Sequence, residues 1–256
     1  MSSRKHDFSI AIDAPIELVW KAISEGEEIT KWFAPDARVT PGEGGSLWLS
    51  WGPGMEGESK ISIWEPGHRF QTLEGPAESP KTVDYILESK GGKTILRLVH
   101  SGFGAEANFD DEYEATYGGW LTFLAMLKHG LENHAGQPAR NVTAFQFIAG
   151  KKAEAWKRLT EAIELQPPAA ELTEQSRYRA TLQGEVLTGI VVRYPKPGYL
   201  CLEVEGSRPG LLSLFVENCG GQCGVTVTRV VFGANAQAPD ITGFLQSQFP
   251  AAGANA

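Results

Sequence analysis

The chain carries an internal repeat, and this repeat constrains its fold more than any other feature. The phrases WKAISE at 20–25 and WKRLTE at 156–161 lie 136 positions apart, and each follows an alternating apolar stretch. Three further matches keep the same order: GES at 57–59 with GEV at 184–186, EPGHRFQTLEG at 65–75 with KPGYLCLEVEG at 196–206, and KGGKTILRLVHSGFG at 90–104 with CGGQCGVTVTRVVFG at 219–233. Because four matches in one order are hard to explain by chance, we interpret the chain as a tandem duplication.

The repeat predicts two domains, residues 1–136 and residues 137–256. A chain of 256 residues is long enough for two domains of ordinary size. The stretch HAGQPAR at 134–140 has the composition of a linker between them. The copies differ in charge, with 12 basic and 21 acidic residues in the first (net −9) and 11 and 10 in the second (net +1).

Composition argues against several classes of function. A net charge of −8 disfavours binding to the negatively charged phosphate backbone of nucleic acids, so we expect no nucleic-acid partner. No apolar run approaches the roughly 20 residues of a membrane-spanning helix, and the first residues lack the apolar core of a signal peptide. Three cysteines without such a peptide fit a reducing cytoplasm. Cys219 and Cys223 have no second ligand pair, so we interpret them as thiols rather than as a zinc site.

The first half alternates between strand and helix patterns. FSIAID at 8–13 has the period of a half-buried strand, Pro15 begins a helix, and GEEITKWF at 26–33 predicts a second short helix. Five strand-like segments between Gly and Pro clusters then predict an antiparallel sheet. A long helix over about 111–132 follows, with a single apolar stripe. Five acidic residues around its start predict charge complementation and capping of the helix N-terminus, in preference to a cation site.

The second half follows the same plan in a reduced form. VTAFQFIAG at 142–150 predicts a strand and KKAEAWKRLTEAIEL at 151–165 an amphipathic helix, and five more strand-like segments follow. Its closing helix, near 240–249, is short, and the final PAAGANA is expected to be a frayed tail.

Each copy therefore predicts an α+β domain, in which an antiparallel sheet curves around a closing helix that covers its apolar face. WFAPDARVTPGEGGSLWLSW, WEPGHRF, LRLVHSGFG and the late GGW resemble the activator of heat-shock-protein ATPase homologue family, a group within the START-like, helix-grip superfamily. The resemblance covers roughly residues 6–133. The second copy resembles the family only through the repeat and is degenerate. The resemblance implies a helix-grip fold, but the superfamily includes carriers, receptors, cyclases and chaperone cofactors.

Strand alternation predicts which side chains of the first copy point beneath the closing helix. Arg97 should face solvent, so Leu98 and His100 face inward, and outward Asp84 leaves Tyr85 facing inward. An apolar, aromatic set with a few polar tips is typical of a small-molecule pocket, although an ordinary core has a similar composition. The predicted ligand-binding residues are Trp32, Trp51, Phe70, Tyr85, Leu87, Leu98, His100, Tyr117, Trp120 and Leu124.

His100 is the inward residue best suited to acid–base chemistry, as a general base or as a hydrogen-bonding anchor for a ligand. A structural histidine would have the same pattern. No nucleophile or orienting carboxylate shares its predicted face, so we predict no catalytic residue. The other histidines show no metal spacing and the glycine clusters match no phosphate loop, so we expect neither a metal nor a cofactor.

Three hypotheses follow for function. The leading one is a protein that binds a small hydrophobic or aromatic molecule in the first copy. The alternative is a chaperone ATPase activator or another cofactor that binds a protein partner, as the family resemblance implies. The third is an enzyme of the cyclase, dehydratase or hydrolase type that uses His100.

Overall fold

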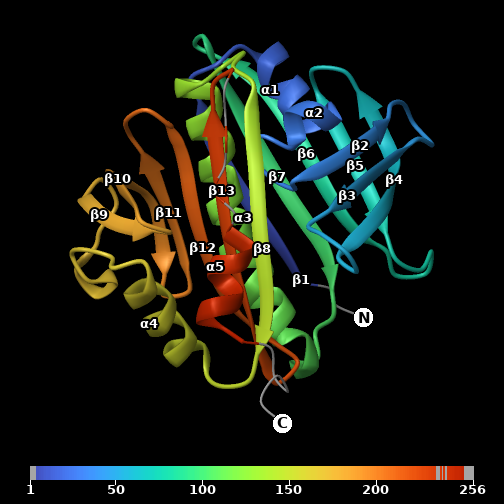
Figure 1. The fold of residues 1–256 in the computed structure, drawn as a ribbon. Helices are drawn as coiled ribbons and strands as arrows, with labels where there is room; N and C mark the ends of the chain where they lie inside the picture. The colour runs from blue at the N-terminus through green and yellow to red at the C-terminus, as the bar shows by residue number, and fades with distance from the viewer. Residues whose placement is uncertain (1–3, 235–236, 238, 240, 251–256) are drawn as a thin grey trace. The chain divides into compact units, whose positions relative to one another are not determined.

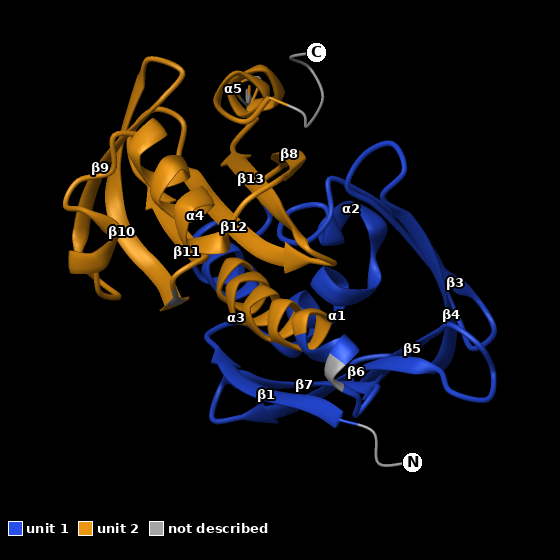
Figure 2. Ribbon diagram, turned by 90° about the horizontal axis from the view of Figure 1, so that it is seen from below, with its two compact units in different colours: residues 1–110, 127–136 blue, residues 111–126, 137–256 orange. Residues whose placement is uncertain are grey.

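The computed structural model describes residues 4–250 apart from 235, 236, 238 and 240 (Figure 1). Contacts between Cα atoms divide the chain into two compact units (Figure 2). The first unit comprises residues 1–110 and 127–136, and the second comprises residues 111–126 and 137–256. The first unit ends at residue 136 and the second continues from residue 137. The stretch 111–126 of the long helix also belongs to the second unit. The predicted division into residues 1–136 and 137–256 stays a prediction.

The first unit is built on a seven-stranded antiparallel sheet in the order β1-β7-β6-β5-β4-β3-β2. Two helices follow the first strand, and a short 3-10 turn (Ala107–Phe109) leads into the long helix α3. The elements are β1 (Arg4–Ile12), α1 (Ile16–Ser24), α2 (Gly26–Ile29), β2 (Asp36–Thr40), β3 (Ser46–Ser50), β4 (Glu56–Glu65), β5 (Arg69–Glu74), β6 (Lys81–Lys90), β7 (Lys93–Phe103) and α3 (Asp110–Asn133).

The inner face of this sheet has the predicted alternation. On β7, Leu96 and Leu98 are buried whereas Arg97 between them is exposed and pairs with Asp7 on β1. Each strand adds every second side chain to the same face because the pleat has a period of two. The core of the first unit forms where these side chains meet the apolar side of α1, which contributes Val19 and Ile23.

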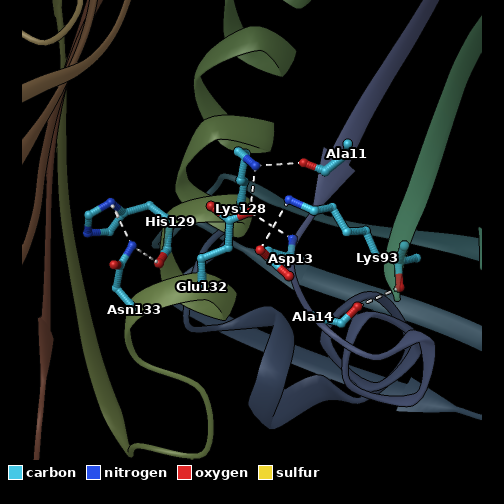
Figure 3. Close-up of polar contacts among 9 residues, drawn as sticks. Ala11, Asp13, Ala14, Lys93, Lys128, His129, Glu132 and Asn133 are labelled. Carbon is cyan, nitrogen blue, oxygen red and sulfur yellow. Dashed lines mark hydrogen bonds and ion pairs between the residues drawn. The ribbon is translucent and has the colours of Figure 1, made fainter. Parts of the chain in front are cut away.

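The last turns of α3 are attached to the end of β1 by polar contacts (Figure 3). The ammonium group of Lys128 donates a 2.6 Å hydrogen bond to the carbonyl of Ala11, and the backbone N–H of Asp13 donates to the carboxylate of Glu132 at 2.7 Å. Lys128 also pairs with Glu132 at the helical spacing i, i+4. These contacts hold the end of α3 at the edge strand of the first sheet.

The second unit repeats the connectivity of the first. Its sheet has six antiparallel strands in the order β8-β13-β12-β11-β10-β9, so the first strand again pairs with the last and a helix again follows the first strand. A 3-10 turn (Ala169–Glu171) takes the place of α2. The elements are β8 (Ala139–Ile148), α4 (Lys152–Ala162), β9 (Arg177–Leu182), β10 (Glu185–Lys196), β11 (Tyr199–Val204), β12 (Gly210–Cys219), β13 (Gln222–Phe232) and α5 (Ile241–Gln248).

Both faces of the second sheet are covered within its unit. Leu200 and Leu212 belong to a core that also includes Leu159 of α4 and Leu245 of α5. Strand residues that alternate with these contact the 111–126 stretch of α3, which belongs to the same unit. These contacts include Phe215 stacked on Phe123 at 5.3 Å, Ser213 beside Met126, and the ring of Tyr199 against Gly118. Burial on both faces explains why β11 and β12 are almost wholly apolar.

Some local expectations were wrong or fall outside the described residues. The second helix is a single turn, Gly26–Ile29, after which tighter turns carry the chain on to Phe33, whose N–H donates to the carbonyl of Ile29. The N-cap residue of α3 is Phe109, which makes no side-chain capping bond, so the residue at the cap is not acidic, whereas Asp110 and Asp111 lie in the first turn. Most of the predicted frayed tail lies outside the described residues. Within the described residues, no helix is long and apolar enough to cross a membrane.

Candidate functional site

A row of aromatic and apolar side chains crosses the inner face of the first sheet. Trp64 on β4 pairs in register with Phe70 on β5, Phe70 pairs with Tyr85 on β6, and Tyr85 pairs with Leu98 on β7. The exposed fractions of Phe70, Tyr85 and Leu98 are 0%, 4% and 0%. The sheet therefore brings three of the predicted site residues together at one level. Leu87, also predicted, is buried on the same strand as Tyr85, two residues further along.

The rings in this row contact one another and one helix residue. Trp64 meets Phe70 edge to face at 5.5 Å, and Phe70 stacks on Tyr85 at 5.8 Å. Trp20 of α1 lies 5.2 Å from Trp64 and 6.4 Å from Phe70. We call Trp20, Trp64, Phe70 and Tyr85 the aromatic cluster. Each such ring pair stabilises its arrangement by about 0.5–1.5 kcal/mol beyond burial.

The hydroxyl of Tyr85 is a polar tip in this apolar setting. Burial raises the pKa of Tyr85 far above its ordinary value, because the phenolate would be poorly solvated there. Tyr85 therefore stays a protonated hydrogen-bonding group at every physiological pH.

His100 lies further along β7, beside a second histidine. It pairs in register with His6 on β1, and both rings contact Phe103, at 4.6 Å and 5.1 Å. Burial lowers the pKa of His100 to about 4, and the positive charges of His6 and Lys81 act in the same direction. His100 is therefore a neutral imidazole at pH 7, able to donate and accept hydrogen bonds.

Trp32 and Trp51 form a separate group with Phe33. Phe33 stacks on Trp32 at 5.1 Å and meets Trp51 edge to face at 5.2 Å. The indole N–H of buried Trp32 donates a 2.8 Å hydrogen bond to the carbonyl of Ala22. Its polar tip is thus bonded to the backbone and not directed to a ligand.

The three predicted residues on α3 belong to the second compact unit. Trp120 and Leu124 are buried, and Trp120 meets Phe123 edge to face at 6.4 Å. Tyr117 exposes 43% of its surface. That Tyr117, Trp120 and Leu124 complete a pocket over the first sheet stays a prediction.

Two members of the aromatic cluster were missed by pattern analysis. Strict alternation along β4 assigns Trp64 to the face opposite Ile61, but the register shifts between Ile61 and Ile63. This irregularity places Trp64 beside Phe70. A signal for Trp20 was present, because it opens the repeated phrase WKAISE. Its equivalent, Trp156, is buried in the core of the second unit.

One protein-family model matches part of this chain. The model of the family described as Activator of Hsp90 ATPase homolog 1-like protein matches residues 13–132. The comparison with curated proteins gives no match.

Among the described residues, no group of three or more His, Cys, Asp or Glu side chains is placed to hold a metal ion.

Solved structures also resemble this chain. The solution structure of the Aha1 dimer from Colwellia psychrerythraea is 22% identical, with a TM-score of 0.45, over 53% of this chain and 100% of that one. Protein MLL2253 from Mesorhizobium loti is 21% identical, with a TM-score of 0.46, over 51% and 98% of the two chains. The di-domain ARO/CYC BexL from the BE-7585A biosynthetic pathway is 15% identical, with a TM-score of 0.44, over 96% and 93%.

The predicted α+β class is confirmed, with two antiparallel sheets and helices that fit a tandem helix-grip arrangement. The family match covers slightly less than half of the chain, and it includes strands β2 to β7 of the first sheet and most of α3.

Proposed function

We propose that the first unit binds a small hydrophobic or aromatic molecule against the inner face of its sheet. The observation that supports this most is the aromatic cluster with the Tyr85 hydroxyl at one end. Aromatic walls supply apolar contact at low entropic cost, and a few polar tips orient the bound molecule. The other predicted pocket residues of the first unit are part of this proposal.

His100 fits this function better as a hydrogen-bonding group than as a catalyst. An imidazole whose pKa is lowered to about 4 is a weak base at neutral pH, and efficient general bases have pKa values near the working pH. We therefore assign His100 to ligand orientation, and an enzymatic role for it is the less supported hypothesis.

The test is binding of the fluorescent probe 8-anilinonaphthalene-1-sulfonate to the full chain and to matched variants. Phe70→Leu keeps an apolar side chain but removes the central ring of the cluster, and we expect it to weaken binding at least about fivefold, because stacking area is lost. Tyr85→Phe removes the hydroxyl alone.

The control is Trp48→Leu. Trp48 lies on β3, where the guanidinium of Arg38 covers its ring at 4.4 Å, so the indole is already in contact with the protein's own side chain. The affinity of Trp48→Leu for the probe should stay within about twofold of the wild-type affinity. If the wild type and Phe70→Leu bound the probe with equal affinity, and circular dichroism showed that both were folded, the probe would bind elsewhere. The aromatic cluster could then not be the ligand-binding site.

The family match favours one further candidate function. The matched description names activation of the Hsp90 ATPase, so a role as a chaperone cofactor is the alternative proposal. Addition of the full chain to a heat-shock ATPase should then raise the rate of ATP hydrolysis. An unchanged rate at a saturating concentration of the chain would exclude this role.

A further inference from the structure

The second unit contains an open cavity of about 480 Å³ with both polar and apolar surface in its walls. Three segments meet there: the first residue of the 111–126 stretch, the start of α4 and the β12–β13 turn. We call it the Lys152 cavity. It is lined by Asp111, Gly150, Lys151, Lys152, Ala153, Asn218, Gly221 and Gln222.

One of the lining residues belongs to a cluster of titratable side chains. The ammonium group of Lys152 lies over the ring of Tyr199, 4.7 Å from its centre. A hydrogen bond joins the hydroxyl of Tyr199 to the carboxyl of Glu217, which is partly buried and also feels the charge of Lys152. The other charged or titratable groups near this cluster and the cavity include Lys151 and Glu154 at the start of α4, Asp111 and Glu114 on α3, Cys219 on β12 and Cys223 on β13.

Two glycines make room for this cluster. A Cβ atom at Gly198 would lie 2.4 Å from Cε of Lys152, and one at Gly118 would lie 2.4 Å from the ring of Tyr199. Gly198 also has a φ of +102°, a conformation that glycine adopts without strain. The backbone thus holds the Lys152 stem and the Tyr199 ring in close, defined positions.

The fold itself does not require the cluster, because the first copy lacks it. The repeat aligns Tyr199 with His68, Lys152 with Ile16 and Glu217 with Glu88. Glu88 is exposed, and a Cβ at Gly67, the equivalent of Gly198, would meet no atom within 4 Å. A helix-grip unit therefore folds without a lysine, a tyrosine and a partly buried carboxylate at these positions.

The carboxyl of Glu217 can change its charge near neutral pH. Burial raises the pKa of Glu217 to about 7, although the Tyr199 hydrogen bond and the Lys152 charge oppose this. When Glu217 is protonated, its carboxyl no longer places a negative charge beside Lys152, which is one of the residues that line the cavity. An anion in the cavity and a charged Glu217 then compete for the same lysine.

We propose that the second unit binds a small molecule through an oxyanion group, a carboxylate or a phosphate, at Lys152, and that Glu217 takes up a proton as this group binds. Lys151, Asn218 and Gln222 supply the further hydrogen-bond donors of the cavity. This site is separate from the ligand face proposed for the first unit.

The test is a titration of the full chain with sulfate and, separately, with acetate, at constant ionic strength, followed by backbone amide chemical shifts. Sulfate stands for a phosphate group and acetate for a carboxylate, and both probes keep their charge between pH 6 and pH 8. We expect saturable shifts at Asn218, Gly221 and Gln222 with at least one probe. Binding should be about tenfold tighter at pH 6 than at pH 8, because the competent protonated form of Glu217 becomes about tenfold rarer.

Variants separate this site from general charge effects. Lys152→Gln should weaken binding at least fivefold, and Glu217→Gln should keep binding but lose its pH dependence. Lys157→Gln is the control, because Lys157 is an exposed lysine of the same helix, paired with Glu161 at 3.8 Å, and it does not line the cavity. No saturable shift with either probe, an equal loss in Lys157→Gln, or pH-independent binding by the wild type would overturn the proposal.

Discussion

At the scale of single residues, Glu217 illustrates how the position of a side chain in the fold, rather than its residue type, determines its pKa. The repeat provides a glutamate at this point in both copies, but only the second is covered by neighbouring side chains. Because its pKa is raised from 4.5 to about 7, chiefly by burial, the folded chain binds more protons than the unfolded chain between these values. The free energy of unfolding therefore falls as the pH rises through this range, and above pH 7 the full cost of the charged form is present.

Glu217→Gln should remove this cost. The amide has nearly the same shape, can still bond to Tyr199 and cannot ionise. We expect the variant to be more stable than the wild type by roughly 1–3 kcal/mol at pH 8, and nearly equal to it at pH 4.5. Urea denaturation at the two pH values measures the difference. Glu161→Gln, at an exposed position on α4, is the control and should show no such trend. A destabilised Glu217→Gln at pH 8 would contradict the account.

At the scale of elements, α3 has adjacent glycines with opposite roles. A Cβ at Gly118 would lie 2.4 Å from the Tyr199 ring, which is itself buried and held by its contacts. A Cβ at Gly119 would meet only one ring atom of Phe123, at 3.8 Å. Both positions have ordinary helical backbone, so the difference between them arises from packing.

The matched substitutions should therefore have opposite signs. Gly119→Ala should stabilise the chain by about 0.5–1 kcal/mol through helix propensity. Gly118→Ala has the same propensity gain but forces Tyr199 aside, and we expect a net loss of about 1–3 kcal/mol. Chemical denaturation of the two variants measures both values. If both variants were stabilised, the packing of α3 on β11 would be wrong.

Pattern analysis succeeded where a strand is regular and one face is buried. It placed Phe70, Tyr85 and Leu98 on the inner face because alternation on β5, β6 and β7 is unbroken. It missed Trp64 because a register shift on β4 has no signal in the apolar pattern. It assigned Asp84 to the outer face, where the structure shows it 8% exposed and paired with Arg69 at 2.7 Å. Alternation gives the face of a side chain but not what covers it.

The Lys152 cavity was missed for a related reason. Its residues come from three segments that lie far apart in the sequence, and none of them carries a recognisable motif. Glu217 appeared in the sequence as one more residue of a strand-like segment. Only the packing of Tyr199 and Lys152 around it changes its chemistry, and such packing depends on tertiary structure.

At the scale of the whole molecule, the two units share a topology but differ in net charge and in the polar side chains that they carry. In both, the first strand pairs with the last, and a helix follows the first strand. The first copy carries a net charge of −9 and the second +1, and the polar cluster at Lys152 occurs in the second copy. We infer that the two units divide two binding tasks, with an apolar ligand bound in the first and an anionic group bound in the second.

Native mass spectrometry of the whole chain, purified without added ligand, tests the central claim most directly. The account predicts a bound species of small-molecule mass that is released on denaturation. Its occupancy should fall in Phe70→Leu and stay unchanged in Trp48→Leu, because only the first variant alters the aromatic cluster. A wild-type spectrum that shows the bare chain alone, or a bound species with equal occupancy in Phe70→Leu, would contradict the claim that this face of the first unit holds a hydrophobic ligand.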